Sequence, residues 1–140
     1  MERFAPLLLD VWREVGRHVE IQETATRLAP LLARRLPLDL LLVRRLEPGA
    51  GRVETLAGGA VRRAPEVLGL RQEGSAAALQ ELSAWHRKGR AVHRDAAALA
   101  RELPGLLPEG LAGDVLAAPL AGDGPPGAFV ALVGRPPRRF

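Results

Sequence analysis

The spacing of apolar residues near the start of the chain predicts a helix. From Phe4, apolar residues recur at Leu7, Leu8, Val11 and Val15, which is the period of a helix with one apolar face. A second helix is expected from about Gln22 to Arg35, and its apolar side would comprise Ala25, Leu28, Leu32 and Leu36. Pro30 should bend this helix, and Pro37 should end it because the residue before a proline avoids the helical region.

After Pro37 the pattern changes to that of strands. The short apolar run Asp39–Leu46 predicts a central strand covered on both faces. A turn follows at residues 47–51, and the alternating residues Arg52–Ala57 predict a hairpin partner with one buried face. Residues 58–71 predict a loop with room for a third short strand, and Gly58 and Gly59 are interpreted as part of a turn.

A helical segment separates this hairpin from a second one. Ser75 is expected to cap a helix that runs to about Lys88, and Gly89 should end it. A short strand over residues 91–94 and a helix over residues 96–103, capped by Asp95, should follow. The apolar stripe of the first of these helices consists of Ala78, Leu79, Leu82 and Trp85.

The second hairpin is the clearest signal in the chain. Asp114–Leu120 and Gly127–Val133 read as strands, joined by a turn over residues 121–126 that is rich in glycine and proline. Pro119 cannot donate to a neighbouring strand, so we expect it at a bulge or a free edge. The order helix, helix, hairpin, helices, hairpin predicts an α+β fold in which an antiparallel sheet carries packed helices.

Length and charge narrow the class of protein. The 140 residues suit one domain, and the formal net charge is +4. Of the 20 basic residues only Lys88 is a lysine, so 19 are arginines. Many of these lie in short, scattered pairs, and only 4% of residues are aromatic, whereas a nucleic-acid-binding protein usually gathers its basic residues on one face. We therefore expect no nucleic-acid binding, although a polyanion-binding surface stays open as an alternative.

The chain contains no cysteine, which excludes disulfides, thiolate metal sites, a catalytic thiol and thioether attachment of a chromophore. The first residues do not have the pattern of a signal peptide, and the longest continuous apolar run, Leu40–Val43, is far too short to span a bilayer. We expect a cytoplasmic protein with no membrane contact.

The ordered segments resemble those of a GAF domain over nearly the whole chain. The resemblance rests on residues 14–20 followed by a helix and residues 38–43, on residues 74–75 followed by a helix and residues 87–95, and on residues 115–120 followed by a turn and residues 127–132. It implies a central antiparallel sheet of five or six strands with helices on both faces, in the manner of GAF, PAS and profilin folds. The helices inserted between the hairpins often enclose a small-molecule pocket in that family.

The resemblance also implies a role in signalling. Such domains commonly sit at the N-terminus of histidine kinases, cyclases or enhancer-binding transcription activators, and the opening residues look most like the last group. We expect residues 1–140 to be one domain and a fragment of a longer bacterial regulator, without its output domain. The chain has no asparagine, which the cyclic-nucleotide-binding members require in their motif, so cGMP and cAMP are not expected as ligands.

The candidate site is a pocket for an unidentified small molecule. On the resemblance, His93, Arg94 and Asp95 would offer polar contacts, Trp85 an aromatic wall, and Leu41 and Val43 the sheet side. A purely structural interpretation is also open: His93 as a strand residue, Arg94 solvated, Asp95 as a helix cap and Trp85 in the core. No metal site, cofactor or catalytic group is expected, because no metal-ligand spacing and no nucleophile–base pair occurs.

A second interface is expected at the first helix. Leu8, Val11, Trp12 and Val15 would join two copies of the chain into a homodimer. These features leave two functional hypotheses: a sensor that binds a small molecule and passes the signal to an output domain, and a ligand-free dimerisation or scaffold domain of a protein such as a histidine kinase. A space between sheet and inserted helices that is filled by side chains would favour the second.

Overall fold

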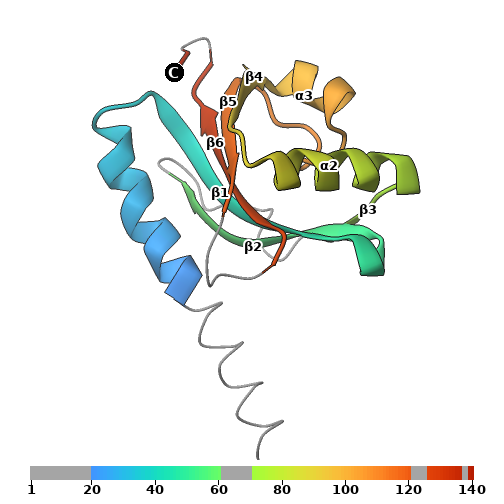
Figure 1. Cartoon of the computed structure of the whole chain (residues 1–140). Helices are drawn as coiled ribbons and strands as arrows, with labels where there is room; N and C mark the ends of the chain where they lie inside the picture. Colours follow the sequence, from blue (N-terminus) through green and yellow to red (C-terminus); the bar gives the residue numbers. More distant parts are fainter. Residues whose placement is uncertain (1–19, 61–70, 121–125, 137–138) are drawn as a thin grey trace, which may run out of the picture.

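Six strands pair into one antiparallel sheet in the order β3-β2-β1-β6-β5-β4 (Figure 1). The computed structural model describes residues 20–60, 71–120, 126–136 and 139–140. The strands and short helices between them are β1 (Leu38–Glu47), η1 (Pro48–Ala50), β2 (Arg52–Ala60), β3 (Arg71–Glu73), α2 (Ala76–Lys88), β4 (Val92–Asp95), α3 (Ala96–Glu102), β5 (Asp114–Pro119) and β6 (Ala128–Gly134). A further helix, here called the N-terminal helix, is described from residue 20 to residue 33.

The two predicted hairpins meet at the centre of this sheet. Strand β1 pairs with β6 through Leu41↔Leu132 and Leu42↔Ala131. Each strand also keeps its hairpin partner, β2 beside β1 and β5 beside β6. The sequence prediction of one antiparallel α+β sheet is therefore confirmed.

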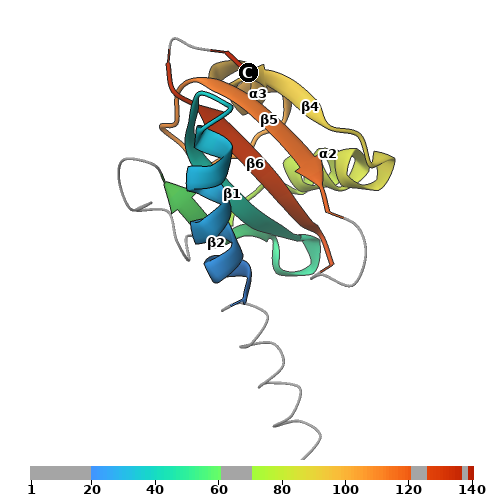
Figure 2. The same ribbon diagram turned by 90° about the vertical axis from the view of Figure 1, so that its left-hand side faces the viewer.

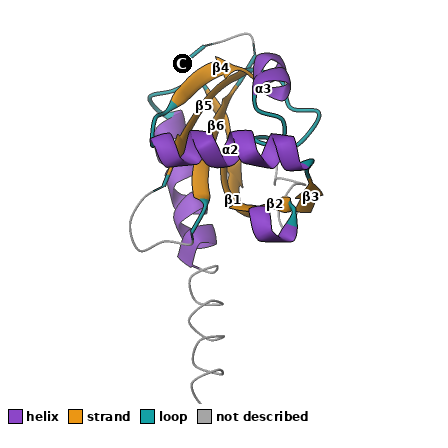
Figure 3. Ribbon diagram, turned by 45° about the vertical axis from the view of Figure 1, so that its right-hand side comes forward, coloured by secondary structure: helices purple, strands orange, loops and turns teal. Residues whose placement is uncertain are grey.

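Helices cover both faces of the sheet. The N-terminal helix lies on one face, called the outer face, while α2 and α3 lie on the other, called the inner face (Figures 1 and 2). Helix α2 runs across the strands (Figure 3). Its predicted ends are confirmed: Ser75 Oγ accepts a hydrogen bond from the Ala78 N–H at 3.1 Å, and Gly89 has the left-handed φ of 68° that glycine adopts without strain.

The backbone of the N-terminal helix lies very close to the backbone of β2. Ala25 and Ala29 are fully buried against the outer face, and a Cβ added at Gly59 would lie 2.4 Å from the Ala25 carbonyl oxygen. The Gln22 amide bonds the edge of β2 beside them: its Nε2 donates to the Gly58 carbonyl at 3.0 Å and its Oε1 accepts from the Gly58 N–H at 3.1 Å. Small side chains and a glycine are required here because the two backbones are nearly in contact.

This contact corrects two predictions. Gly58 and Gly59 are not in a turn, since β2 continues through them to Ala60. Leu28 does not lie on the packed side of the helix: it is 41% exposed, and Ala29 takes the buried position. Glycines were interpreted as turn formers, whereas here they provide room for a helix.

Pro119 lies where the free-edge interpretation places it. The pairing of β4 with β5 ends at Val92↔Ala117, two residues before Pro119. The Leu120 N–H donates to Ala128 of β6, so the nitrogen of Pro119 points to the opposite, unpaired side. Within the part of the chain that is described, no helix is long and apolar enough to cross a membrane.

The substitution Gly59→Ala tests the close approach. The added methyl group would meet the Ala25 carbonyl and Ala29 Cβ, so the helix must move away and we expect a loss of about 1–3 kcal/mol in the free energy of unfolding. Urea denaturation followed by circular dichroism measures it. Gly49→Ala is the matched control, because its added methyl group meets nothing within 4 Å. Equal stability of the two variants would contradict the proposed contact.

Candidate functional site

The inner layer, between the sheet and α2 and α3, contains a completely buried arginine. Arg44 is 0% exposed and lies at the middle of β1. Its Nε donates to Thr55 Oγ1 at 3.1 Å, its Nη1 to the carbonyl oxygens of Gly105 at 2.8 Å and Leu106 at 3.0 Å, and its Nη2 to Gln72 Oε1. One side chain thus connects β1, β2, β3 and the segment that follows α3.

All of these acceptors are neutral. Burial lowers the pKa of Arg44 to about 10, so the guanidinium keeps its charge at neutral pH. Removing such an ion from water costs several kcal/mol unless its donors are hydrogen-bonded. Here the protein itself provides the bonds, so the guanidinium is not a vacant anion-binding group.

A bulge in β2 places the partners of Arg44. The pairing passes from Val43↔Ala57 to Arg44↔Thr55 and leaves Leu56 as the extra residue. Because paired residues share a face of the sheet, Arg44 and Thr55 point together into the inner layer. The sequence contained a signal for this residue: Arg44 alternates with Leu42 and Leu46, which both face inward.

Apolar side chains fill most of the remaining inner layer. Those that are fully or nearly fully buried include Leu42, Leu46, Val53, Leu79, Leu82, Leu99, Leu106, Val115 and Phe129. Trp85 packs against this cluster, its ring edge-on to that of Phe129 with centroids 5.5 Å apart. The Trp85 indole N–H is buried and has no hydrogen-bond acceptor among the described residues, which is uncommon for a buried donor.

A separate polar cluster lies at the β4 side of the sheet. His93 Nε2 is 2.6 Å from Asp114 Oδ2, and the same oxygen accepts the backbone N–H of Phe140 at 2.8 Å. Asp114 is only 8% exposed. Burial by itself opposes ionisation, but the hydrogen bonds from His93 and Phe140 and the nearby charge of Arg139 outweigh it, so the pKa of Asp114 lies below its usual value.

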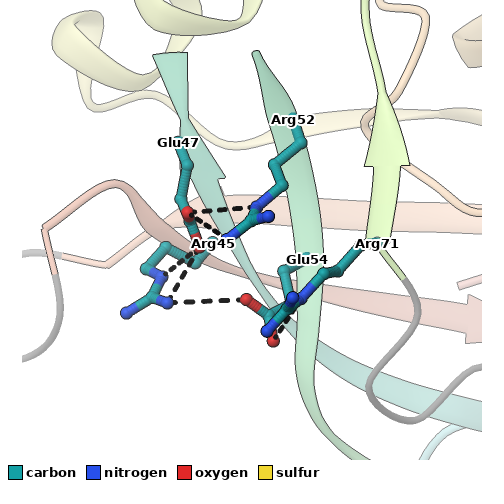
Figure 4. A network of polar contacts seen from close by, with 5 residues as sticks. All are labelled: Arg45, Glu47, Arg52, Glu54 and Arg71. Carbon is teal, nitrogen blue, oxygen red and sulfur yellow. Dashed lines mark hydrogen bonds and ion pairs between the residues drawn. The ribbon is translucent and has the colours of Figure 1, made fainter. Parts of the chain in front are cut away.

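Beyond the N-terminal helix, the outer face carries an ion-pair network (Figure 4). The Glu47 carboxylate forms ion pairs with the guanidinium groups of Arg45 at 2.8 Å and Arg52 at 3.3 Å. The Glu54 carboxylate lies 3.5 Å from the guanidinium nitrogens of both Arg45 and Arg71. Burial opposes ionisation of Glu47, but the bond and charge of Arg45 dominate and lower its pKa. These pairs are partly exposed to solvent, and ion pairs near the surface contribute little stability each. They keep the open end of the sheet face polar.

The architecture matches solved structures of GAF domains. The blue-light absorbing form of the Thermosynechococcus elongatus PixJ GAF domain aligns with a TM-score of 0.59 and 14% identity over 89% of this chain and 73% of that one. The GAF domain of an Acinetobacter phosphoenolpyruvate-protein phosphotransferase aligns with a TM-score of 0.58 and 15% identity over 96% of this chain and 81% of that one. A far-red cyanobacteriochrome photoreceptor aligns with a TM-score of 0.53 and 14% identity over 94% of this chain and 81% of that one. No family model and no curated protein matches the chain.

The chain has the GAF fold. The resemblance seen in the ordered segments of the sequence is confirmed at this level. The six residues expected to line a GAF pocket are not brought together, however. Leu41 and Val43 belong to the outer cluster around Ala25 and Ala29, on the opposite face of the sheet from Trp85. Alternate residues of β1 face opposite sides, so the inward neighbours Leu42 and Arg44 occupy that space instead.

The three polar residues of β4 lie at the edge of this GAF fold. His93 bonds Asp114 as described, Arg94 lies 3.5 Å from Glu102, and Asp95 accepts the Ala98 N–H at 2.7 Å as the cap of α3. All three are exposed in the sheet's edge strand, whereas Trp85 packs against the buried inner cluster. Asp114, the central acceptor of the cluster, was missed because a lone aspartate before a strand has no distinctive pattern.

Of the other predictions, the dimer interface falls outside the described residues. Leu8, Val11, Trp12 and Val15 lie outside the described residues, so the predicted interface stays a prediction. Among the described residues no three histidine and acidic side chains are grouped to hold a metal ion. Ser75 is occupied as a helix cap.

Acid titration tests the Asp114 cluster. A carboxylate whose folded pKa is depressed stabilises the fold above its unfolded value of about 3.9, and this contribution is lost as the pH falls through the folded pKa. We expect Asp114→Asn to lower the free energy of unfolding by about 1–3 kcal/mol at pH 7, and the difference from the parent chain to shrink below about pH 4. Urea midpoints at pH 7, 5 and 3.5 measure it. Asp95→Asn, which keeps a capping acceptor, is the control; a difference independent of pH would refute the account.

Proposed function

We propose that this GAF-fold chain is a regulatory domain that dimerises through its N-terminal helix and passes a change in that dimer to an output domain of a longer protein. One observation carries the proposal. The helix has apolar residues on two sides: Ala25 and Ala29 pack on the sheet, while Leu28 and Leu31 are 41% and 54% exposed on the other side. Residues three apart are neighbours on a helix surface, so these leucines form one apolar patch.

The packing of the C-terminal residue supports transmission. Phe140 packs against the same outer cluster as the N-terminal helix, together with Val130 and Leu132 of β6. Both ends of the described chain therefore share one small core. A shift of the helix in a dimer would change the packing of the segment that leads onward from β6.

A scaffold or dimerisation role also agrees with the inner layer. The space that would shelter a ligand is occupied by the apolar cluster and by Arg44, whose bonds are all made within the protein. The similar structures are the PixJ GAF domain, the GAF domain of a phosphotransferase and a cyanobacteriochrome photoreceptor, and this likeness supports our proposal of a regulatory role. We propose a bacterial enhancer-binding transcription regulator as the parent protein and a histidine kinase as the alternative.

A second function, sensing of a small molecule in the inner layer, is favoured by one detail. The buried Trp85 N–H has no acceptor among the residues that the structure describes, and a polar ligand that entered beside it would provide one. Such a ligand shifts the equilibrium between two arrangements only by the difference in its affinity for them.

The exposed leucines provide the test of dimerisation. We expect the double variant Leu28→Glu/Leu31→Glu to be monomeric by light scattering at concentrations where the parent chain is dimeric, because two carboxylates would face each other across the interface. Leu120→Glu is the control, since Leu120 is 43% exposed at the end of β5 and away from the helix. The predicted residues Leu8 and Val11 are tested in the same way with Leu8→Glu and Val11→Lys. A parent chain that is monomeric, or a double variant of unchanged mass, would exclude the proposal.

A thermal-shift screen against metabolites tests the sensor. We expect a true inner-layer ligand to raise the melting temperature of the parent chain by several degrees, and this shift to disappear in Trp85→Phe, which keeps the ring contact but lacks the N–H. Flat melting curves across a broad library would exclude the sensor function while leaving dimerisation untouched.

A further inference from the structure

Four arginines from distant parts of the sequence line one surface groove of about 430 Å³. The other residues that line this groove are aliphatic. The lining residues are Ala33, Arg34, Arg35, Leu36, Pro37, Arg135 and Arg139.

Three segments build this groove, here called the arginine groove. The turn after the N-terminal helix contributes Arg34 and Arg35, and the end of β6 is attached to that turn by the Arg135 N–H, which donates to the Pro37 carbonyl at 2.8 Å. The C-terminal tail contributes Arg139, and the bond from the Phe140 N–H to Asp114 holds that tail in place. Figures 1 and 2 both show the C-terminus beside the turn that joins the helix to β1.

The charges of the groove are not balanced within the described residues. Elsewhere the arginines of the sheet have partners: Arg45, Arg52 and Arg71 bond Glu47 or Glu54, and Arg94 bonds Glu102. None of the four groove arginines forms an ion pair with a described carboxylate. The charge of Arg139 acts on Asp114, which is also bonded to His93.

We propose that the arginine groove binds a small, soluble phosphorylated molecule. Guanidinium groups match phosphate oxygens with two parallel hydrogen bonds, and several like charges around one hollow attract an anion of two or more charges. The volume suits a metabolite, since small-molecule pockets span about 300–1,000 Å³. No aromatic side chain lines the described groove, so it lacks the stacking platform that single-stranded nucleic acids use.

Arginines at the end of a helix also have a structural role, because they stabilise the negative end of the helix dipole. That role explains Arg34 and Arg35 but not Arg135 or Arg139, which both follow β6. The inference concerns a different surface from the leucine patch and does not rest on the proposed dimer.

Isothermal titration of the full chain with pyrophosphate at low salt tests the site. We expect saturable binding to the parent chain, and affinity at least tenfold weaker in Arg35→Gln/Arg135→Gln. The control Arg90→Gln/Arg101→Gln removes the same charge from exposed positions outside the groove, and its affinity should stay within about twofold of the parent. Equal weakening in both variants would mean non-specific attraction and would refute the site, as would a parent chain that binds no pyrophosphate.

Two further measurements keep the outcome decisive. If Arg35→Gln/Arg135→Gln fails to fold by circular dichroism, Arg139→Gln in the exposed tail replaces it, with an expected weakening of about threefold or more. Co-sedimentation with phosphatidylglycerol vesicles separates a lipid headgroup from a soluble ligand. Binding to vesicles without binding to pyrophosphate would overturn the proposal.

Discussion

The architecture of the inner layer depends on the burial of one positive charge. Arg44 lies at the centre of the sheet, and a guanidinium there is tolerable only if its donors are bonded. The hydroxyl of Thr55, the amide of Gln72 and the carbonyl groups of residues 105 and 106 meet that requirement. The bulge at Leu56, the short edge strand β3 and the path of the chain after α3 all serve to place these acceptors.

The two faces of the sheet follow different physical rules. On the inner face, large side chains and Arg44 fill a thick layer beneath α2 and α3. On the outer face, Ala25, Ala29 and Gly59 allow the N-terminal helix to approach to backbone contact. A thin layer of that kind gives the helix little freedom to move without disturbing β2, and the tail residue Phe140 shares its core. The proposed transmission through the N-terminal helix and Phe140 therefore belongs to the outer face.

The candidate site was predicted less well than the fold, for identifiable reasons. Leu41 and Val43 were assigned to the same pocket as Trp85. A continuous apolar run does not show which of its residues face which side of the sheet, because packing against the helices decides this. Asp95 was correctly interpreted as a helix cap because that interaction is local. The partner of His93 is Asp114, which lies on a neighbouring strand, and pairing between strands is a tertiary property. Arg34, Arg35 and Arg139 were counted among scattered pairs, and Arg135 was not singled out. Arg35 and Arg135 line one groove only after β6 has paired with β1.

The order and type of most elements, both hairpins and the caps at Ser75 and Asp95 could be predicted from the residues alone, as could the placing of Pro119 at a bulge or a free edge. These features depend on apolar period, glycine and proline geometry and short-range hydrogen bonds, which act over a few residues. Four features became visible only in the folded chain: which side of each strand faces which helix, the packing of the N-terminal helix on Gly59, the burial of Arg44 and the groove that the arginines share. These features depend on contacts between segments far apart in the chain, and such contacts form only when the strands have paired into the sheet.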